Sequence, residues 1–368
     1  MSGASGCTPR IIIRSCRSAD PWASRSCLRS RIGPSRASIS TFPSRTSDSS
    51  GWLPKLFTSA SSGQPKIRWT QPPPTGWSPA TDGNPLIDAV SSYVSGTELS
   101  RLSVHDTEEY LDTDQNWRVR PGYGALVAAF GTASGVATNT VVRSVDHSGS
   151  DKIRIETSRR IICASKVICT IPTTLLAAEA LRFDPPLVAK IDAAAGLPLG
   201  SAEKVMLHVA EADELPVDGH LFGATDRTAT GSYDLRPMGQ PCIEAFFGGS
   251  LARELQARGE LADFAIEELI NLFGSNFRDR NRVLACSAWA GDCLSGGSYS
   301  YALPSHAGVR TRLAEPVDDR IFFAGEATSQ RFFSTAHGAY QSGRRAAMEA
   351  MRSLGIASQG SAGSLASP

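Results

Sequence analysis

Long apolar runs and strong charge are both missing from this 368-residue sequence. No stretch approaches the ~18 consecutive apolar residues that a membrane-spanning helix requires, so we expect no membrane span. The formal net charge is +1, which gives no general electrostatic reason to bind nucleic acid or an anionic membrane. We therefore expect a small molecule as the partner, with no nucleic acid, and the sequence leaves the oligomeric state open.

The cysteines and histidines lack the spacing of a disulfide framework or a metal site. Eight cysteines are scattered along the chain without a CxxC pair, and no histidine falls at zinc-ligand spacing. We predict no metal site. Scattered cysteines suit a reducing compartment, and we expect a cytoplasmic location.

Residues 1–74 differ in composition from everything that follows. They are rich in Ser, Arg and Pro, nearly devoid of acids, and without sustained hydrophobic periodicity. Three interpretations fit: a poorly ordered segment, an organellar transit peptide, or translation in a wrong frame upstream of the true coding sequence. We rank the first and third above targeting.

From residue 76 the sequence has the pattern of a folded protein of α/β and α+β class. Hydrophobic spacing predicts helices and strands. The expected helices cover 85–94, 106–111, 125–130 and 261–273, the last stopped by Gly274. The expected strands cover 138–146, 152–157, 167–171, 202–210, 242–247 and 283–289. We expect the first three strands to form a small sheet and the later ones to form a mixed sheet.

The segment 320–326, RIFFAGE, reads as a short buried strand that ends in Gly325 and Glu326. Open α/β sheets present groups to ligands at such strand ends. Ser334 or Thr335 can then cap a helix that runs to about residue 354. Gly338 leaves the first turn bare for a flat ligand, and free amides at a helix start favour negative charge, as on a reduced flavin. The spacing alone fits equally well with a strand, a turn and a tightly packed helix.

Residues 321–345, IFFAGEATSQRFFSTAHGAYQSGRR, closely resemble the flavin-containing amine oxidase family, which includes monoamine oxidases, polyamine oxidases and lysine-specific histone demethylases. The resemblance implies an FAD-binding Rossmann-like domain, here incomplete, with an inserted mixed-sheet substrate domain. We assign the partial FAD-binding domain to 75–172 and 290–355, the substrate domain to 173–289 and a tail to 356–368. The implied activity is oxidation of an amine to an imine, then a carbonyl, with oxygen as acceptor and hydrogen peroxide as product.

The resemblance also implies roles for residues at the cofactor. Glu326, following Gly325 at the strand end, would contact the ribityl or phosphate part of FAD, and Thr335 with Ala336 would lie under the flavin ring. Val142 matches a strand position near the adenine end. A further implied cofactor contact is Trp289.

Two residues are implied on the substrate side. Tyr299, in the GGSYS turn, would form one side of the substrate site and hold the amine against the flavin. The structural alternative is an ordinary half-buried tyrosine. Lys204 would hold a water at flavin N5 and assist the reaction of the reduced flavin with oxygen. The structural alternative is a lysine whose ammonium reaches the surface. Ser298 stands where monoamine oxidases carry a flavin-linking cysteine, so the FAD should be non-covalent.

One motif of the family is not found. Its members begin with a strand, GxGxxG and a helix, whose backbone amides approach the pyrophosphate, and nothing in residues 1–75 provides this. Two alternatives therefore remain open: a truncated, inactive remnant that does not hold FAD, or a flavin-dependent amino-acid oxidase. An arginine near Tyr299 would favour the second.

Overall fold

The computed structural model describes residues 84–112, 117–132 and 134–356. The predictions for residues 1–74 and for nearly all of the tail lie outside these ranges. Within them, no helix is both long and apolar enough to cross a membrane.

The strands form three sheets. In chain order they are β1 (Val142–Asp146), β2 (Ile153–Thr157), β3 (Ile161–Ala164), β4 (Val167–Cys169), β5 (Arg182–Asp184), β6 (Ala202–Val209), β7 (Gly219–Phe222), β8 (Ser232–Leu235), β9 (Cys242–Gly248), β10 (Asn281–Cys286) and β11 (Ile321–Phe323). A four-stranded sheet has the order β3-β2-β1-β5, a five-stranded sheet the order β10-β6-β9-β8-β7, and β11 pairs with β4 in parallel.

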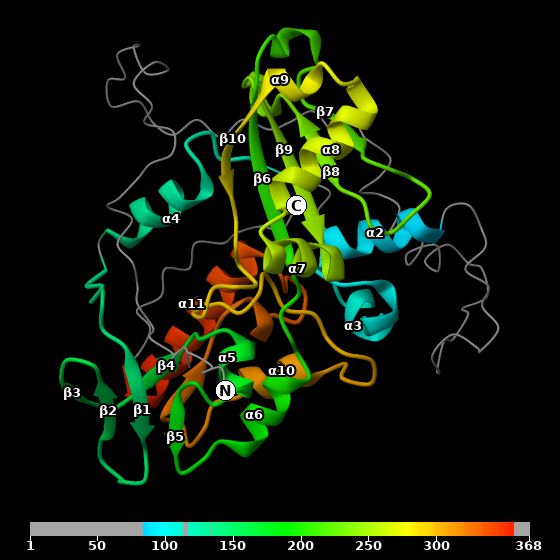
Figure 1. The fold of residues 1–368 in the computed structure, drawn as a ribbon. Coiled ribbons are helices and arrows are strands. Elements are labelled where there is room, and N and C mark those ends of the chain that lie inside the picture. The colour runs from blue at the N-terminus through cyan, green and yellow to red at the C-terminus, as the bar shows by residue number, and fades with distance from the viewer. Residues whose placement is uncertain (1–83, 113–116, 133, 357–368) are drawn as a thin grey trace, which may run out of the picture.

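The α-helices connect and cover these sheets. They are α2 (Asn84–Ser95), α3 (Val104–Glu108), α4 (Tyr123–Gly131), α5 (Thr173–Ala177), α6 (Val188–Ala195), α7 (Gly249–Arg258), α8 (Leu261–Phe273), α9 (Phe277–Arg280), α10 (Val309–Ala314) and α11 (Ala336–Ser353). Short 3-10 turns cover Leu99–Arg101, Ala212–Glu214, Pro237–Gly239 and Glu326–Thr328. In Figure 1 the five-stranded sheet occupies one half of the molecule, and β1–β5, α5, α6, α10 and α11 the other.

Each half has its own hydrophobic core. The first core joins the two smaller sheets to α5, α6 and α10 through side chains such as Ile153, Phe183 and Ile321. The second core packs one face of the five-stranded sheet against α7 and α8. Residues 176–197 contribute to the first core, so the change from one core to the other falls nearer residue 200 than residue 172. The domain assignment itself stays a prediction.

β6 shows which face of the five-stranded sheet carries the second core. Val205, Leu207 and Val209 are buried in the second core, as the two-residue period of a strand requires. The intervening side chains, Lys204 among them, lie on the opposite face, which we call the open face. This alternation places a predicted site residue outside the core.

Several sequence predictions are wrong in detail. The strand at 167–171 does not join β1 and β2: β4 pairs with β11, and β2 pairs with β1 on one side and on the other with β3, which the prediction missed. The five-stranded sheet is antiparallel at every pairing rather than mixed, because short turns connect β7, β8 and β9. The mixed sheet is the four-stranded one, where β1 runs parallel to β5.

The helix predictions fare better. α2, α4, α8 and α11 form where the hydrophobic spacing placed them, and Gly274 ends α8 with a φ of 91°. The second predicted helix, 106–111, is the shorter α3, Val104–Glu108. On α11 the buried stripe is Gly338, Ser342, Ala346 and Ala350, and Leu354 is exposed.

Candidate functional site

The end of β11 is locked onto α11. Gly325 has a φ of +125°, which favours glycine. Its N–H donates to Ser342 Oγ at 3.0 Å, and Ser342 Oγ donates back to the Gly325 carbonyl at 2.9 Å. The strand end and the middle of the helix therefore hold a fixed separation.

Glu326 joins three segments of the chain. Its carboxylate accepts hydrogen bonds from the Ser300 N–H at 3.0 Å, the Ser300 hydroxyl at 2.8 Å and the Ser334 N–H at 2.7 Å. Ser334 takes a left-handed φ of 61°, and its hydroxyl donates to the Ser300 carbonyl at 2.8 Å. The predicted contact of Glu326 with the cofactor stays a prediction. In the structure, Glu326 holds the Ser300 and Ser334 segments together at the start of α11.

Thr335, one of the two caps that the sequence allowed, is the N-cap of α11. Its Oγ1 accepts from the Gly338 N–H at 3.0 Å and donates to the Phe332 carbonyl at 2.7 Å. The cap leaves the first-turn N–H groups of Ala336 and His337 as donors at an electropositive helix start. Ala336 is exposed there.

Glycine is needed at position 338 for a different reason from the one that the sequence suggested. A Cβ at this position would overlap the carbonyl oxygen of Phe332. The glycine therefore allows the loop before α11 to pack against the first turn, and the expectation that it leaves room for a flat ligand is wrong.

Tyr299 precedes Ser300, the partner of Glu326, and is bonded to α2. Its hydroxyl donates to the Tyr93 carbonyl, and burial raises the pKa of its phenol. The Tyr93 ring in turn lies 6.2 Å from Phe222 and 6.0 Å from Phe246, centroid to centroid. Lys204 Nζ lies 5.0 Å from the centroid of the same Phe246 ring. Lys204 thus contacts the aromatic group directly, and Tyr299 contacts it through the Tyr93 carbonyl.

Trp289 and Val142 are not members of this aromatic group. Trp289 follows β10 in a loop and is 53% exposed, so the predicted strand 283–289 ends too late. Val142 belongs to β1 and packs against the first core. Their predicted cofactor contacts stay predictions.

A buried ion pair supports the Glu326 network, and sequence reasoning missed it. Arg310 on α10 is 1% exposed and binds Asp106 of α3 through Nε and Nη2, both at 2.9 Å. Its Nη1 donates to Ser300 Oγ at 2.8 Å, and its guanidinium lies 3.8 Å from the Phe333 ring centroid. No sequence signal distinguishes Arg310 from a surface arginine, because its partners lie far away in the chain.

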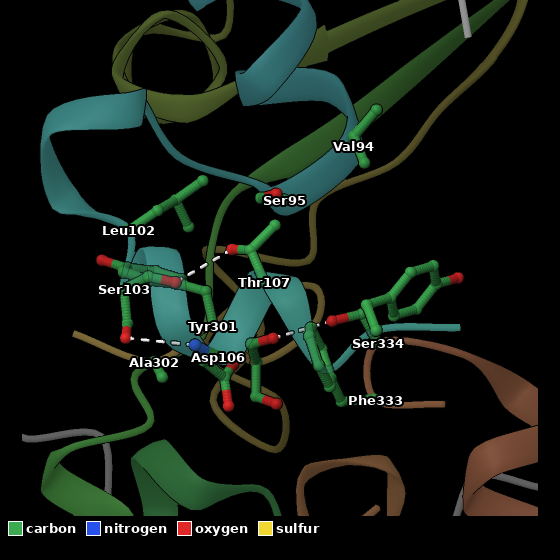
Figure 2. A pocket seen from close by; sticks show the side chains of 12 residues that line it. Val94, Ser95, Leu102, Ser103, Asp106, Thr107, Tyr301, Ala302, Phe333 and Ser334 are labelled. Atoms are coloured by element: carbon green, nitrogen blue, oxygen red, sulfur yellow. Dashed lines mark hydrogen bonds between the residues drawn. The ribbon is translucent and has the colours of Figure 1, made fainter. Parts of the chain in front are cut away.

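A cavity of about 120 Å³ lies beside this ion pair. Figure 2 shows its lining, to which Asp106, Tyr301, Phe333 and Ser334 contribute. None of the predicted site residues lines it, and it is smaller than the roughly 300–1,000 Å³ of drug-sized ligand sites. The cavity, which Ser300 also lines, is therefore too small for a cofactor of the size of FAD.

The residues at the start of α11 fit the ring end of a flavin. Fixed first-turn amides suit developing negative charge. Ser298 Oγ, next to Tyr299, is buried without a hydrogen-bond partner in the protein, which leaves a polar group for water or a ligand to satisfy. No strand–GxGxxG–helix unit occurs in the described ranges, so the fit extends to the ring end alone.

A helix start that favours anions, set against a strand ending in glycine and glutamate, is a cofactor-binding arrangement of α/β proteins. The chain belongs to the flavin-containing amine oxidoreductase family, whose model matches residues 74–351. This confirms the resemblance seen in the sequence.

Comparison with individual proteins gives the same result. The chain is 29% identical over 249 residues to lysine-specific histone demethylase 1 homolog 2 of Arabidopsis thaliana, covering 63% of this chain and 32% of the relative. It is 29% identical over 264 residues to polyamine oxidase 2 of Arabidopsis thaliana, covering 69% and 52%. The chain thus spans about a third to a half of these relatives.

The fold resembles that of cyclohexylamine oxidase from Brevibacterium oxydans IH-35A. The TM-score is 0.59 at 17% identity, and the match covers 74% of this chain and 64% of the oxidase. At this identity the likeness concerns the fold alone.

Proposed function

We propose that this chain oxidises an amine to an imine at a non-covalently bound FAD, with oxygen as acceptor and hydrogen peroxide as product. The imine then hydrolyses to a carbonyl compound. The observation that carries the proposal is the hydrogen bonding of the Glu326 carboxylate to Ser300 and Ser334. These bonds set the end of β11, the Ser300 segment and the start of α11 beside one another. Membership of the flavin-containing amine oxidoreductase family supports it.

The chemistry that FAD supplies when bound is acceptance of a hydride equivalent from the amine α-carbon and transfer of the electrons to oxygen. The side chains bind and position. Thr335 fixes the start of α11, whose free amides favour the charge of a reduced flavin. Tyr299 offers one wall for the amine, and its hydroxyl is held by Tyr93. Lys204 supplies an ammonium on the open face.

Purified protein reconstituted with FAD tests the proposal through hydrogen peroxide production across a panel of primary and secondary amines. We expect at least one amine to give turnover and Lys204→Met to lower the peroxide rate about 10-fold or more. Tyr299→Phe keeps the ring and loses only the bond to Tyr93, so it serves as the mild control. Loaded protein without peroxide from any amine contradicts the proposal.

A remnant that does not hold FAD is the second candidate, and two observations favour it. All four large apolar side chains of α4 are exposed: Tyr123, Leu126, Val127 and Phe130. In the part of the chain that the structure describes, the β11–β4 sheet has two strands, whereas parallel sheets are normally larger and covered on both faces. Exposed apolar surface of this kind predicts aggregation of the isolated chain, which size-exclusion chromatography measures.

The amino-acid oxidase alternative calls for an arginine at the site, and Arg118 is one arginine that lies on the open face. Its guanidinium binds two carboxylates of the protein, those of Glu244 and Asp234. A guanidinium already paired in this way does not favour a substrate carboxylate, and we prefer a simple amine.

A further inference from the structure

Two neighbours on the adjacent strand hold the ammonium of Lys204. Phe246 is the register partner of Lys204 on β9, and its ring centroid lies 5.0 Å from Nζ. Glu244, two residues earlier on the same face of β9, pairs with Nζ through Oε1. The ammonium is therefore fixed by a ring and a carboxylate rather than directed freely into solvent.

Glu244 is itself held by a second cation. Asp234 lies directly opposite on β8, and like charges in that position destabilise a sheet. Arg118 relieves this repulsion: its Nη1 lies 3.0 Å from Glu244 Oε2, and its Nη2 pairs with Asp234. Because Arg118 occupies Oε2, Oε1 is left for Lys204.

The carboxylate is the fixed member of the Lys204–Glu244 pair. The Glu244 side chain is 12% exposed and that of Lys204 is 48% exposed. Burial acts to raise the pKa of Glu244, but the charges of Lys204 and Arg118 outweigh it and hold the pKa below its usual value. Glu244 thus remains an anion where the flexible lysine stem would otherwise leave the ammonium many rotamers.

We infer that Glu244 is a positioning residue that orients Lys204 for its part in the reaction of the reduced cofactor with oxygen. The inference rests on the proposed function. Glu244 acts through Lys204, so its loss should change the behaviour of that one lysine and of the oxygen step, while binding and oxidation of the amine continue.

The first test needs no cofactor. The folded full chain is treated briefly with acetic anhydride, and acetylation of each lysine is measured by mass spectrometry, with Lys152 of the other half as internal reference. An ion-paired ammonium is a poor nucleophile, so we expect Glu244→Gln to raise acetylation of Lys204 relative to Lys152 about 3–10-fold. Glu244→Asp keeps the carboxylate and should restore part of the protection.

Asp234→Asn is the matched control, since it removes a carboxylate from Arg118 and leaves the Lys204–Glu244 pair intact. We expect Lys204 acetylation to stay within about twofold of the parent. Equal acetylation of Lys204 in the parent and Glu244→Gln overturns the inference, as does an equal rise in Asp234→Asn.

The second test separates the two half-reactions of FAD-loaded protein by stopped flow. Glu244→Gln should slow reoxidation by oxygen about 10-fold and leave anaerobic reduction by the amine within about twofold. Equal slowing of both half-reactions indicates a merely structural role and overturns the inference. If the chain does not take up FAD, the proposed function fails, while the acetylation contrast still decides whether Glu244 positions Lys204.

Discussion

The buried pair of Arg310 and Asp106 gives the sharpest stability prediction. The two side chains are 1% and 6% exposed, and the guanidinium makes two bonds of 2.9 Å to the carboxylate. Arg310→Met leaves the Asp106 carboxylate buried without its cation, and Asp106→Asn leaves the guanidinium without its anion. Breaking a buried pair from one side costs about 3–5 kcal/mol.

The double variant separates this cost from simple loss of packing. If the two single costs were independent, Arg310→Met with Asp106→Asn would lose about 6–10 kcal/mol, the sum of two losses of about 3–5. In the double variant no charge is left buried alone. We therefore expect a loss of no more than about 5 kcal/mol, a coupling of at least about 1 kcal/mol and larger if each single cost is near its upper value.

The assay is urea unfolding followed by tryptophan fluorescence, with linear extrapolation to water. Arg310→Lys keeps the charge but loses the bidentate geometry. Its free energy of unfolding should fall between those of the parent and Arg310→Met. It also supplies a folded comparison if Arg310→Met unfolds outright. Single variants that each cost less than about 1 kcal/mol, or a double variant equal to their sum, would refute the reasoning.

Two further predictions concern α11 and the open face. Gly338→Ala places a Cβ on the Phe332 carbonyl and should cost about 1–3 kcal/mol, whereas Gly343→Ala, whose Cβ meets open space, should stabilise α11 by about 0.5–1 kcal/mol; urea unfolding of the two variants compares them directly. Burial lowers the pKa of His220, so below its ordinary pKa of about 6.5 the unfolded chain takes up the proton more readily and stability falls as the pH drops. Unfolding curves between pH 7.5 and 5 should show a shallower fall for His220→Gln, and an unchanged slope would count against the assignment.

The sequence predicted those elements whose pattern is strong and local. α8 and α11 repeat apolar or small residues at helical spacing, and β6 has Val205, Leu207 and Val209 at a two-residue spacing, so their existence followed from periodicity. The N-cap at Thr335 followed from capping chemistry. β3 was missed because a four-residue strand offers too few positions for a period to show.

What the sequence could not predict are contacts between distant segments. Arg310 and Asp106 are 204 positions apart, and Tyr299 and Tyr93 are 206 apart. Local pattern carries no information about such pairings. The partner of β4 was mispredicted for the same reason, since β11 lies far along the chain.

The proposed function places the ring end of FAD at the start of α11. It is tested most directly by titrating FAD into the full-length protein while recording visible absorbance and flavin fluorescence. Ala336→Trp would block the exposed first turn of α11, and Gln341→Trp is a matched control at an exposed position further along the helix. We predict saturable spectral changes with the parent and Gln341→Trp, their loss with Ala336→Trp, and release of the flavin on denaturation. A parent that leaves the FAD spectrum unchanged, or Ala336→Trp protein that binds as well as the parent, would contradict the claim.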